Sequence, residues 1–228
     1  MEYFSPLRAA FGKCVCMCQR HYSELPDYGF HDAEPLWGSQ YLWPVIRSIV
    51  ASRSFPSRRA LDLGCGNGST TNMLSELGFE ATGIDPSQSG IAIAKRAYPH
   101  CTFANASGYE DLAARFGQFG LVLSVEVLQH CAYPRRIAQR LFELVEPDGV
   151  ALVSVAYHSY LKNLALALSG HFDRHFDALR EAGPLKFFSI ATFESLLRQA
   201  GFRHVEFCRA GRVPILAKSM IAVARKDV

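Results

Sequence analysis

The run from Arg59 to Gly68, Arg-Ala-Leu-Asp-Leu-Gly-Cys-Gly-Asn-Gly, constrains the fold more than any other part of the chain. Its first half is apolar enough for a short buried strand, and the alternating glycines Gly64, Gly66 and Gly68 require a tight turn directly after it. Hydroxyl side chains at positions 69–71 suit the first turn of a helix, and apolar residues follow at helical spacing. The run therefore predicts a strand, a glycine loop and a helix, a unit in which backbone N–H groups come close to a ligand.

The spacing of the glycines separates two kinds of nucleotide ligand. The dinucleotide fingerprint Gly-x-Gly-x-x-Gly would need a glycine at position 69, where this chain has Ser69. Asp62 precedes the first glycine by two positions, where a carboxylate would repel a diphosphate but would suit a ligand with an ammonium group. A zwitterionic amino-acid tail fits better than a dinucleotide, and a glycine turn without a ligand is the remaining alternative.

The segment Leu-Asp-Leu-Gly-Cys-Gly-Asn-Gly at 61–68 resembles motif I of the class I S-adenosylmethionine-dependent methyltransferases. The resemblance implies an α/β fold: a three-layer, doubly wound, mostly parallel seven-stranded sheet of the Rossmann-like methyltransferase type. It also implies S-adenosyl-L-methionine (SAM) as cofactor and S-adenosyl-L-homocysteine (SAH) as product. Asp62, Gly64 and Gly66 become predicted cofactor-binding residues.

A second acid ends the next predicted strand, Glu80–Asp85. A carboxylate at this place can accept hydrogen bonds from both ribose hydroxyls of a bound nucleoside. Pro86 is a good first residue for a helix, so a helix cap at Asp85-Pro86-Ser87 is an alternative that does not exclude ribose binding. We assign Asp85 and Pro86 to the cofactor site.

Three further positions, after the third and fourth predicted strands, belong to the predicted cofactor site. In the family, the loop after the third strand approaches the adenine ring, often with an Asp side chain. The matching position here is Ser107, followed by Gly108, so a hydroxyl or backbone groups would replace that carboxylate. Val125, which ends the fourth strand predicted over Gly120–Val125, completes the predicted set.

The stretch Glu126-Val-Leu-Gln-His130 resembles the corresponding part of the ubiquinone-biosynthesis O-methyltransferases, which methylate phenol-like hydroxyls and carry Glu-x-x-Glu-His there. Two carboxylates and a histidine suit a divalent ion. Because this chain has Gln129 at the second acid, we predict no metal, with Glu126 and His130 as ligands only if the enzyme is metal-dependent. His130 is the predicted catalytic base for a phenolic proton, and a structural histidine is the alternative.

Residues 1–54 are predicted to form an N-terminal helical and lid segment ahead of a methyltransferase domain at 55–228. The region 24–44 is aromatic and broken by prolines, which indicates loops and turns before a helix at Leu42–Val50. In the family, the segment before motif I folds over the cofactor and closes the substrate cavity. Trp37, Gln40 and Tyr41 are therefore candidate substrate contacts, and packing beside the sheet is an equal alternative.

A cap of about 159–188 is predicted after the fifth strand, Val150–Ala156. Its apolar residues recur at spacings of three and four, so they line a substrate cavity or cover the sheet. Tyr157 and His158 follow that strand, at the edge where parallel sheets bind ligands, and are substrate-pocket candidates. A helix at Ile190–Ala200 closed by a glycine and two final strands, the last antiparallel by family analogy, complete the plan.

Composition narrows the partners of the chain. With 228 residues, 49% of them apolar, it can bury one sizeable core and an additional cap. A net charge of +3 without a dense Lys/Arg run disfavours nucleic acid as a substrate. No apolar run reaches the roughly 18 residues of a membrane span, and the N-terminus lacks the apolar core of a secretory signal. We therefore expect a cytoplasmic enzyme that acts on a small molecule.

Seven cysteines are scattered along the chain, which favours free thiols over a disulfide framework. Cys14, Cys16 and Cys18, followed by His21, could supply soft metal ligands, but their one-residue spacers differ from structural zinc patterns. An amphipathic helix over 1–23 with small apolar cysteines is the alternative.

The sequence thus predicts methyl transfer from SAM to a small-molecule acceptor, most simply a hydroxyl of a phenol- or quinol-like metabolite. An N- or C-methyltransferase stays open, as does a non-catalytic module that only binds the cofactor. The acceptor, the pathway and the oligomeric state, a homodimer among the options, are not fixed by the sequence.

Overall fold

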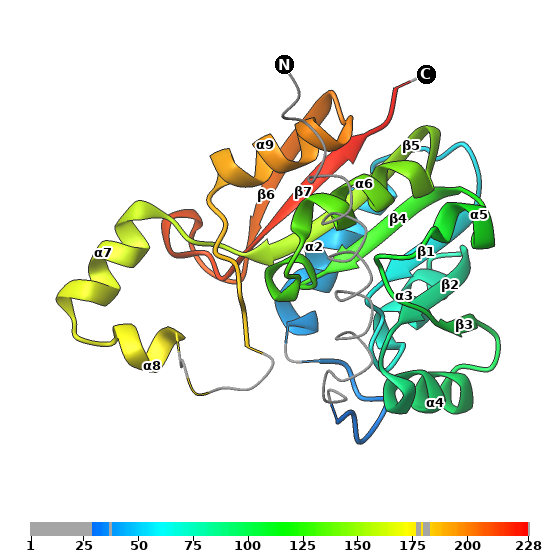
Figure 1. Ribbon diagram of the computed structural model, residues 1–228, viewed down its shortest axis with the longest axis horizontal. Coiled ribbons are helices and arrows are strands. Elements are labelled where there is room, and N and C mark those ends of the chain that lie inside the picture. The colour runs from blue at the N-terminus through cyan, green and yellow to red at the C-terminus, as the bar shows by residue number, and fades with distance from the viewer. Residues whose placement is uncertain (1–28, 37, 177–178, 180–182, 228) are drawn as a thin grey trace, which may run out of the picture.

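Seven strands form one sheet with helices on both faces in the computed structural model, which describes residues 29–36, 38–176, 179 and 183–227 (Figure 1). The strands are β1 (Arg59–Leu63), β2 (Glu80–Asp85), β3 (Thr102–Asn105), β4 (Phe119–Val125), β5 (Val145–Ala156), β6 (His204–Ala210) and β7 (Ser219–Arg225). The helices are α2 (Ser39–Ala51), α3 (Ser69–Glu76), α4 (Gln88–Ala97), α5 (Leu112–Phe116), α6 (Pro134–Leu144), α7 (Tyr160–Leu168), α8 (Phe172–Phe176) and α9 (Ile190–Ala200), with short 3₁₀ turns η2 (Leu128–His130) and η3 (Pro214–Leu216).

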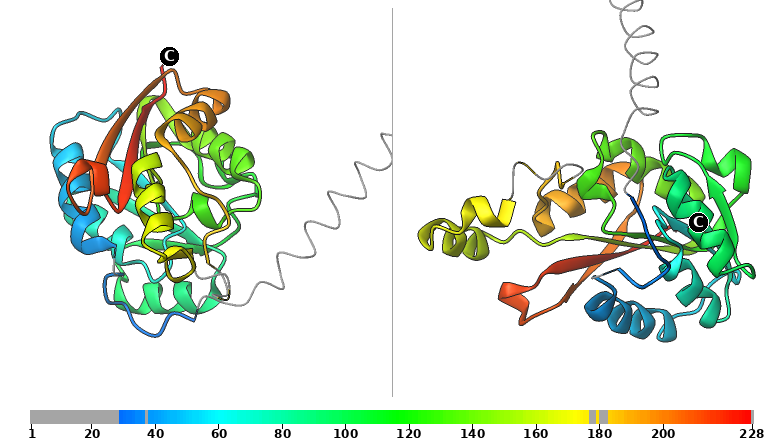
Figure 2. Two further views of the ribbon diagram at one scale, coloured as in Figure 1. Left: turned by 90° about the vertical axis from the view of Figure 1, so that its left-hand side faces the viewer. Right: turned by 90° about the horizontal axis from the view of Figure 1, so that it is seen from below.

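The sheet is buried between two helical layers. β4 and most of β5 are buried, as expected for nearly continuous apolar strands covered on both faces. Helices α2 and α3 lie on one face of the sheet and helices α6 and α9 on the other (Figure 2). The side chains of the first pair share one core cluster with the sheet, and those of the second pair share another. This arrangement confirms the predicted three-layer, doubly wound architecture.

The strand order, β3-β2-β1-β4-β5-β7-β6, reverses direction between β1 and β4. The loops that leave the carboxyl ends of β1 and β4 therefore run in opposite directions. In open parallel sheets, ligands bind in the crevice that forms at this point, on the carboxyl edge of the strands. β1 to β5 are parallel, whereas β7 is antiparallel to β5 and β6, as predicted. Ser219 at the start of β7 therefore lies opposite Ala156 at the end of β5, on this same edge.

Local sequence signals located some helices better than others. Helix α9 is confirmed, with a capping box of Ser189 and Thr192 and a positive φ at Gly201. Helix α2 begins at Ser39, earlier than the predicted start at Leu42 and inside the region 24–44 predicted as loops and turns. Pro44 lies inside α2 and removes one backbone donor, but burial of the apolar side of the helix outweighs this loss. The short helix α5 was not predicted.

A cap formed by α7 and α8 follows β5 and extends away from the sheet (Figures 1 and 2). None of the residues of α7 is buried, and Leu161, Leu164 and Leu168 are 54%, 41% and 80% exposed. The stripe of α7 therefore does not cover the sheet, and that alternative was wrong because the helix leaves the body of the molecule. The chain returns at Leu185, whose N–H donates to the backbone oxygen of Gln129 at 2.7 Å.

Several expectations concern parts of the chain that the structure does not describe. The helix at 1–23, with Cys14, Cys16, Cys18 and His21, lies outside the described residues. The division at residue 54 stays a prediction. Over the described ranges, no helix has the length and apolar character needed to cross a membrane.

Candidate active site

The glycine loop after β1 has the backbone that its sequence predicts. Gly64, Gly66 and Gly68 have φ values of 85°, 52° and 82°, in the left-handed region that side chains other than glycine rarely occupy. A Cβ atom at Gly64 would lie 2.3 Å from Cγ2 of Val127, in the loop after β4. The loop therefore requires glycine for its conformation and, at Gly64, for its contact with the neighbouring loop.

Four N–H groups of this loop bond within the protein, whereas the sequence predicted a unit whose N–H groups come close to a ligand. Those of Gly64 and Cys65 donate to the carbonyl oxygen of Ile84, at 2.7 and 3.1 Å. That of Gly66 donates to Asp85 Oδ2 at 2.9 Å, and that of Gly68 donates within the loop. A diphosphate cradle needs such donors for its ligand. These four N–H groups already have acceptors within the protein, which agrees with the glycine spacing in disfavouring a dinucleotide.

Asp62 lies beneath the glycine loop. Its side chain is 1% exposed and accepts a hydrogen bond from Thr71 Oγ1 at 2.8 Å. Burial raises the pKa of Asp62 to about 7, the Thr71 bond opposes this rise, and the charge of Asp85 adds to it. A cationic group beside Asp62 would favour its ionised form, so the predicted contact with an ammonium group stays a prediction that this charge environment supports.

Asp85 joins the loops that follow β1 and β2. Besides the bond from Gly66, its Oδ1 accepts the N–H of Ser87 at 2.8 Å, and the side chain is only 8% exposed. The cap of α4 is Ser87, whose Oγ accepts the N–H of Gly90. Pro86 precedes the cap and does not open the helix as expected. The predicted ribose contact of Asp85 stays a prediction.

The end of β3 is joined to the start of the loop after β2 by an interaction that the sequence analysis did not predict. Asn105 pairs with Asp85 in the sheet and donates through Nδ2 to the carbonyl oxygens of Asp85 and Pro86, at 3.1 and 2.8 Å. Ser107 uses its backbone N–H and its Oγ in a local turn, and Gly108 follows it. The sequence signal for Asn105 was an amide side chain at the end of a predicted strand, directly after the strand that ends with Asp85.

The segment 29–36 lies against the glycine loop. Asn67 Nδ2 donates to the carbonyl oxygens of Asp32 and Glu34, at 3.0 and 2.8 Å. Asn67, which lies between Gly66 and Gly68, is 1% exposed, and its buried side chain holds this segment in place. The resemblance predicted that the chain before motif I folds over the cofactor and closes the substrate cavity. Residues 29–36 lie beside the glycine loop, and the lid role stays a prediction.

Phe30 makes the closest approach in that segment. A Cβ atom built at Gly66 would lie 2.7 Å from its ring, and one built at Gly90 would lie 2.9 Å from it. The ring therefore packs where the glycine loop meets the first turn of α4, on two residues that have no side chain. Phe30 was not among the predicted residues, because no spacing rule identifies an aromatic lid contact.

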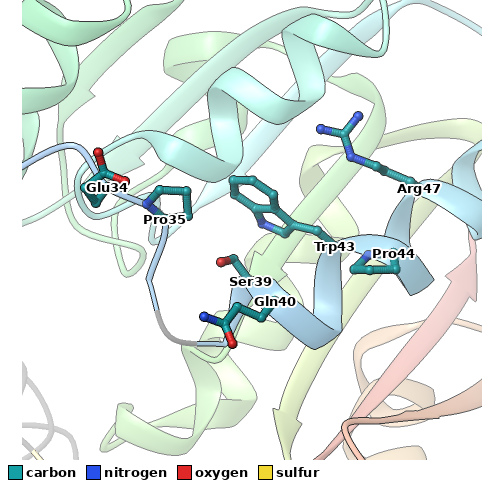
Figure 3. Close-up of a pocket in the computed structure, with 7 residues that line it drawn as sticks. All are labelled: Glu34, Pro35, Ser39, Gln40, Trp43, Pro44 and Arg47. Atoms are coloured by element: carbon teal, nitrogen blue, oxygen red, sulfur yellow. The ribbon is translucent and has the colours of Figure 1, made fainter.

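The predicted substrate contacts on α2 point in different directions. The Tyr41 hydroxyl lies 3.2 Å from Ser219 Oγ, at the carboxyl edge of β5. Neighbouring helical residues point about 100° apart, and Gln40 is exposed. Gln40 lines a separate open groove of about 480 Å³ with Trp43 (Figure 3). The structure thus places Tyr41, but not Gln40, beside the sheet edge, and Trp37 lies outside the described residues.

A hydrogen-bonded group of side chains occupies the edge beside β4 and β5. Glu126 has a φ of 59° and accepts from Ser154 Oγ at 2.9 Å and from Gln129 Nε2 at 3.0 Å. Gln129 Oε1 accepts the N–H of Ala156 at 3.1 Å. Val125, the predicted cofactor contact, immediately precedes Glu126 and is partly exposed. Ser154 and the bridging role of Gln129 were not predicted, because both depend on pairing of β4 with β5.

His130 ends the turn η2 and is half-buried. Its backbone N–H donates to Val127 at 2.9 Å, which fixes its place close to the glycine loop that Val127 contacts. Its role as base stays a prediction. Within the described part of the chain, no three His, Cys, Asp or Glu side chains are grouped closely enough to hold a metal ion.

Tyr157 and His158 follow β5 in two different environments. The Tyr157 ring is 7% exposed, belongs to the main core and lies under the Arg209 guanidinium at 5.4 Å. His158 is 8% exposed and packs between Phe176 and Phe187, with ring centroids 5.6 and 4.9 Å away. Burial, followed by the charge of Lys162, lowers the pKa of His158 to about 4. In this structure His158 anchors the cap.

Comparison with known proteins gives the family. Residues 40–206 match the family model described as a methyltransferase domain. A ubiquinone biosynthesis O-methyltransferase of Mesorhizobium japonicum is 33% identical over 130 residues, 54% of this chain and 51% of that protein. Its counterpart from Bradyrhizobium diazoefficiens is 35% identical over 127 residues, 54% and 49% of the two chains. The chain thus spans about half the length of the curated relatives it matches.

Solved structures agree at the level of the fold. The magnesium protoporphyrin IX methyltransferase of Synechocystis PCC 6803 with bound SAH has a TM-score of 0.63 and 18% identity, covering 82% of both chains. A putative O-methyltransferase from Nostoc punctiforme PCC 73102 has a TM-score of 0.61 and 19% identity, covering 80% of this chain and 55% of that one. Because the family model also covers more than half of its length, this chain belongs to the methyltransferase-domain family and has the Rossmann-like fold of these proteins.

Proposed function

We propose that this chain transfers the methyl group of SAM to a hydroxyl of a phenol- or quinol-like small molecule and releases SAH. The observation that carries the proposal is the pair of joined loops at the carboxyl ends of β1 and β2. Three glycines there have positive φ, and the carboxylate of Asp85 bonds to the N–H of Gly66. The likeness to ubiquinone biosynthesis O-methyltransferases supports a phenolic acceptor.

Charge supports SAM over a phosphorylated cofactor. Two acids, Asp62 and Asp85, are buried beside the glycine loop, whose N–H groups bond within the protein. A ligand with an ammonium and a sulfonium group gains from this negative charge, and a diphosphate does not. The proposed cofactor-binding residues share the carboxyl ends of the first four strands and are Asp62, Gly64, Gly66, Asp85, Pro86, Ser107, Gly108 and Val125.

The residues beside β4 and β5 are proposed to hold the acceptor. When SAM is bound, it supplies a methyl group that is already electrophilic, so the protein has chiefly to align and confine the reactants. Tyr41 and Glu126 line the edge next to the glycine loop, and His130 is the proposed base for the hydroxyl proton. His158 contributes to the pocket through the cap that it anchors.

Isothermal titration of the full chain with SAM and with SAH tests the cofactor. Mass spectrometry after incubation with SAM and a panel of phenols, catechols, amines and active-methylene compounds tests the acceptor. The proposal expects saturable binding of both nucleosides and an O-methylated product. Absence of binding at millimolar SAM would refute the cofactor assignment, and N- or C-methylated products alone would refute the acceptor class.

A further inference from the structure

Glu126 is held by neutral donors at the end of β4. Its left-handed φ of 59° is uncommon for a residue other than glycine, so its surroundings must stabilise it. Ser154 Oγ donates to Oε1 at 2.9 Å, and Gln129 Nε2 donates to Oε2 at 3.0 Å. The backbone N–H of Glu126 donates to the carbonyl oxygen of Ser154 at 3.1 Å. Both the carboxylate and the backbone of Glu126 are thereby joined to β5.

The second partner of Gln129 fixes the direction of its amide. The N–H of Ala156 can only donate, so the atom it faces at 3.1 Å must be the amide oxygen. The NH₂ group must then face Glu126. A glutamine binds a metal through its oxygen, and this oxygen is already used and turned away from the carboxylate. The group that faces Glu126 carries partial positive charge and disfavours a cation between the two side chains.

Gln129 also connects this network to the cap. Its backbone oxygen accepts the N–H groups of Leu185 and Lys186, at 2.7 and 3.0 Å, where the chain returns from α8. Its side chain is 4% exposed. One residue therefore joins the end of β4, the end of β5 and the returning cap.

The protein supplies a cation of its own near Glu126. Lys162 on α7 donates through Nζ to the carbonyl oxygen of Tyr157 at 2.9 Å. Burial and the charge of Arg212 lower the pKa of Lys162, and the negative charge of Glu126 opposes this change. The negative charge of Glu126 thus favours the charged form of Lys162, whose Nζ bonds to the backbone of Tyr157.

We propose that Gln129 takes the structural place of a divalent cation, so that Glu126 and the acceptor side of the site are organised without one. The inference rests on the proposed function, because it describes the acceptor side of that same site. Its chemical consequence is that no Lewis acid lowers the pKa of the acceptor hydroxyl. The proton must then pass to a side-chain base, the role proposed for His130.

Gln129→Glu tests the proposal by adding a second carboxylate about one hydrogen-bond length from the first. Two like charges at that distance repel, and a divalent ion between two carboxylates relieves the repulsion. We expect the thermal midpoint of the full wild-type chain to be unchanged by millimolar Mg²⁺. The variant should unfold earlier without Mg²⁺ and gain a few degrees with it. Thiols bind Mg²⁺ poorly, so the cysteines contribute no signal.

Two controls isolate the added charge. The double variant Glu126→Gln/Gln129→Glu again has one acid and one amide, and we expect no response to Mg²⁺. Gln199→Glu places the same charge on the exposed face of α9, again without a response. A response equal to that of Gln129→Glu in either control would overturn the assignment of the site.

Two results would overturn the proposal directly. One is a rise in the thermal midpoint of the wild-type chain with Mg²⁺ that is lost in Glu126→Gln. This test does not require that a Gln129 variant folds. The other is a folded Gln129→Glu chain that does not respond to Mg²⁺. Neither readout depends on methyl transfer. Failure of SAM binding would therefore refute the proposed function separately from the cation result.

Discussion

Replacement of Asp62 by asparagine should change how the stability of the protein depends on pH. Asp62 is 1% exposed, and its burial raises its pKa from 3.8 to about 7. Between these values the folded chain binds more protons than the unfolded chain, so the free energy of unfolding falls as pH rises through this window. A shift of about three pKa units lowers the free energy of unfolding by about 4 kcal/mol once the pH has risen above the folded-state pKa.

Asparagine has nearly the same shape as aspartate and does not titrate. Its amide oxygen can accept the Thr71 hydroxyl, although the buried NH₂ group costs about 1–3 kcal/mol if it lacks a partner. That cost is independent of pH. Between pH 5 and pH 8.5 the wild-type chain should therefore lose about 2–3 kcal/mol of unfolding free energy relative to Asp62→Asn.

Urea unfolding of both chains at pH 5, 7 and 8.5, without cofactor, measures this difference. Other titrating groups contribute equally to both chains and largely cancel. Asp173→Asn on α8 replaces an exposed aspartate by asparagine and serves as the control for the substitution itself. Parallel stability curves for wild type and Asp62→Asn would refute the raised pKa. The variant should also bind SAM more weakly if Asp62 faces its ammonium group.

The remaining predictions address the loops and the proposed base. Gly64→Ala should lower the free energy of unfolding, measured in urea, by about 2–4 kcal/mol, because the residue has a positive φ and its Cβ would meet Val127 at 2.3 Å. Adding Val127→Ala should recover the part of this loss that comes from the clash, but not the part that comes from the backbone conformation. Asp85→Ala should weaken SAM binding about tenfold or more by titration calorimetry, because two backbone N–H groups lose their acceptor; unchanged affinity would contradict the ribose assignment. His130→Ala should lower kcat with little change in the KM for SAM, and full turnover would exclude His130 as the base.

Features that depend on local backbone chemistry were predictable from the sequence. The turn at 64–68 follows from three glycines, since few other residues adopt their φ values. Helix α9 follows from Ser189 at its start and Gly201 at its end. Asp85 was located as the acid that ends the predicted strand after the glycine loop, and β2 does end at this residue.

Features that depend on strand pairing or on helix direction were not predictable. Asn105 matters because it lies beside Asp85 in the sheet, and the register of β2 and β3 is not visible in either segment alone. Tyr41 and Gln40 adjoin in sequence, yet only the packing of α2 decides which of them reaches β7. The start of α2 was missed because Pro44 is a strong local signal that burial of the helix overrides.

The two halves of the candidate site differ in how they are held, and this difference explains what the sequence could reveal. The proposed cofactor half is fixed by backbone, through glycine conformations and N–H groups that bond to Ile84 and Asp85. The proposed acceptor half is fixed by side chains from distant segments, among them Gln129 and Ser154. Single substitutions can alter such contacts without moving the glycine loop. The glycine-loop motif therefore predicts the cofactor, whereas the acceptor must be found by experiment on this chain.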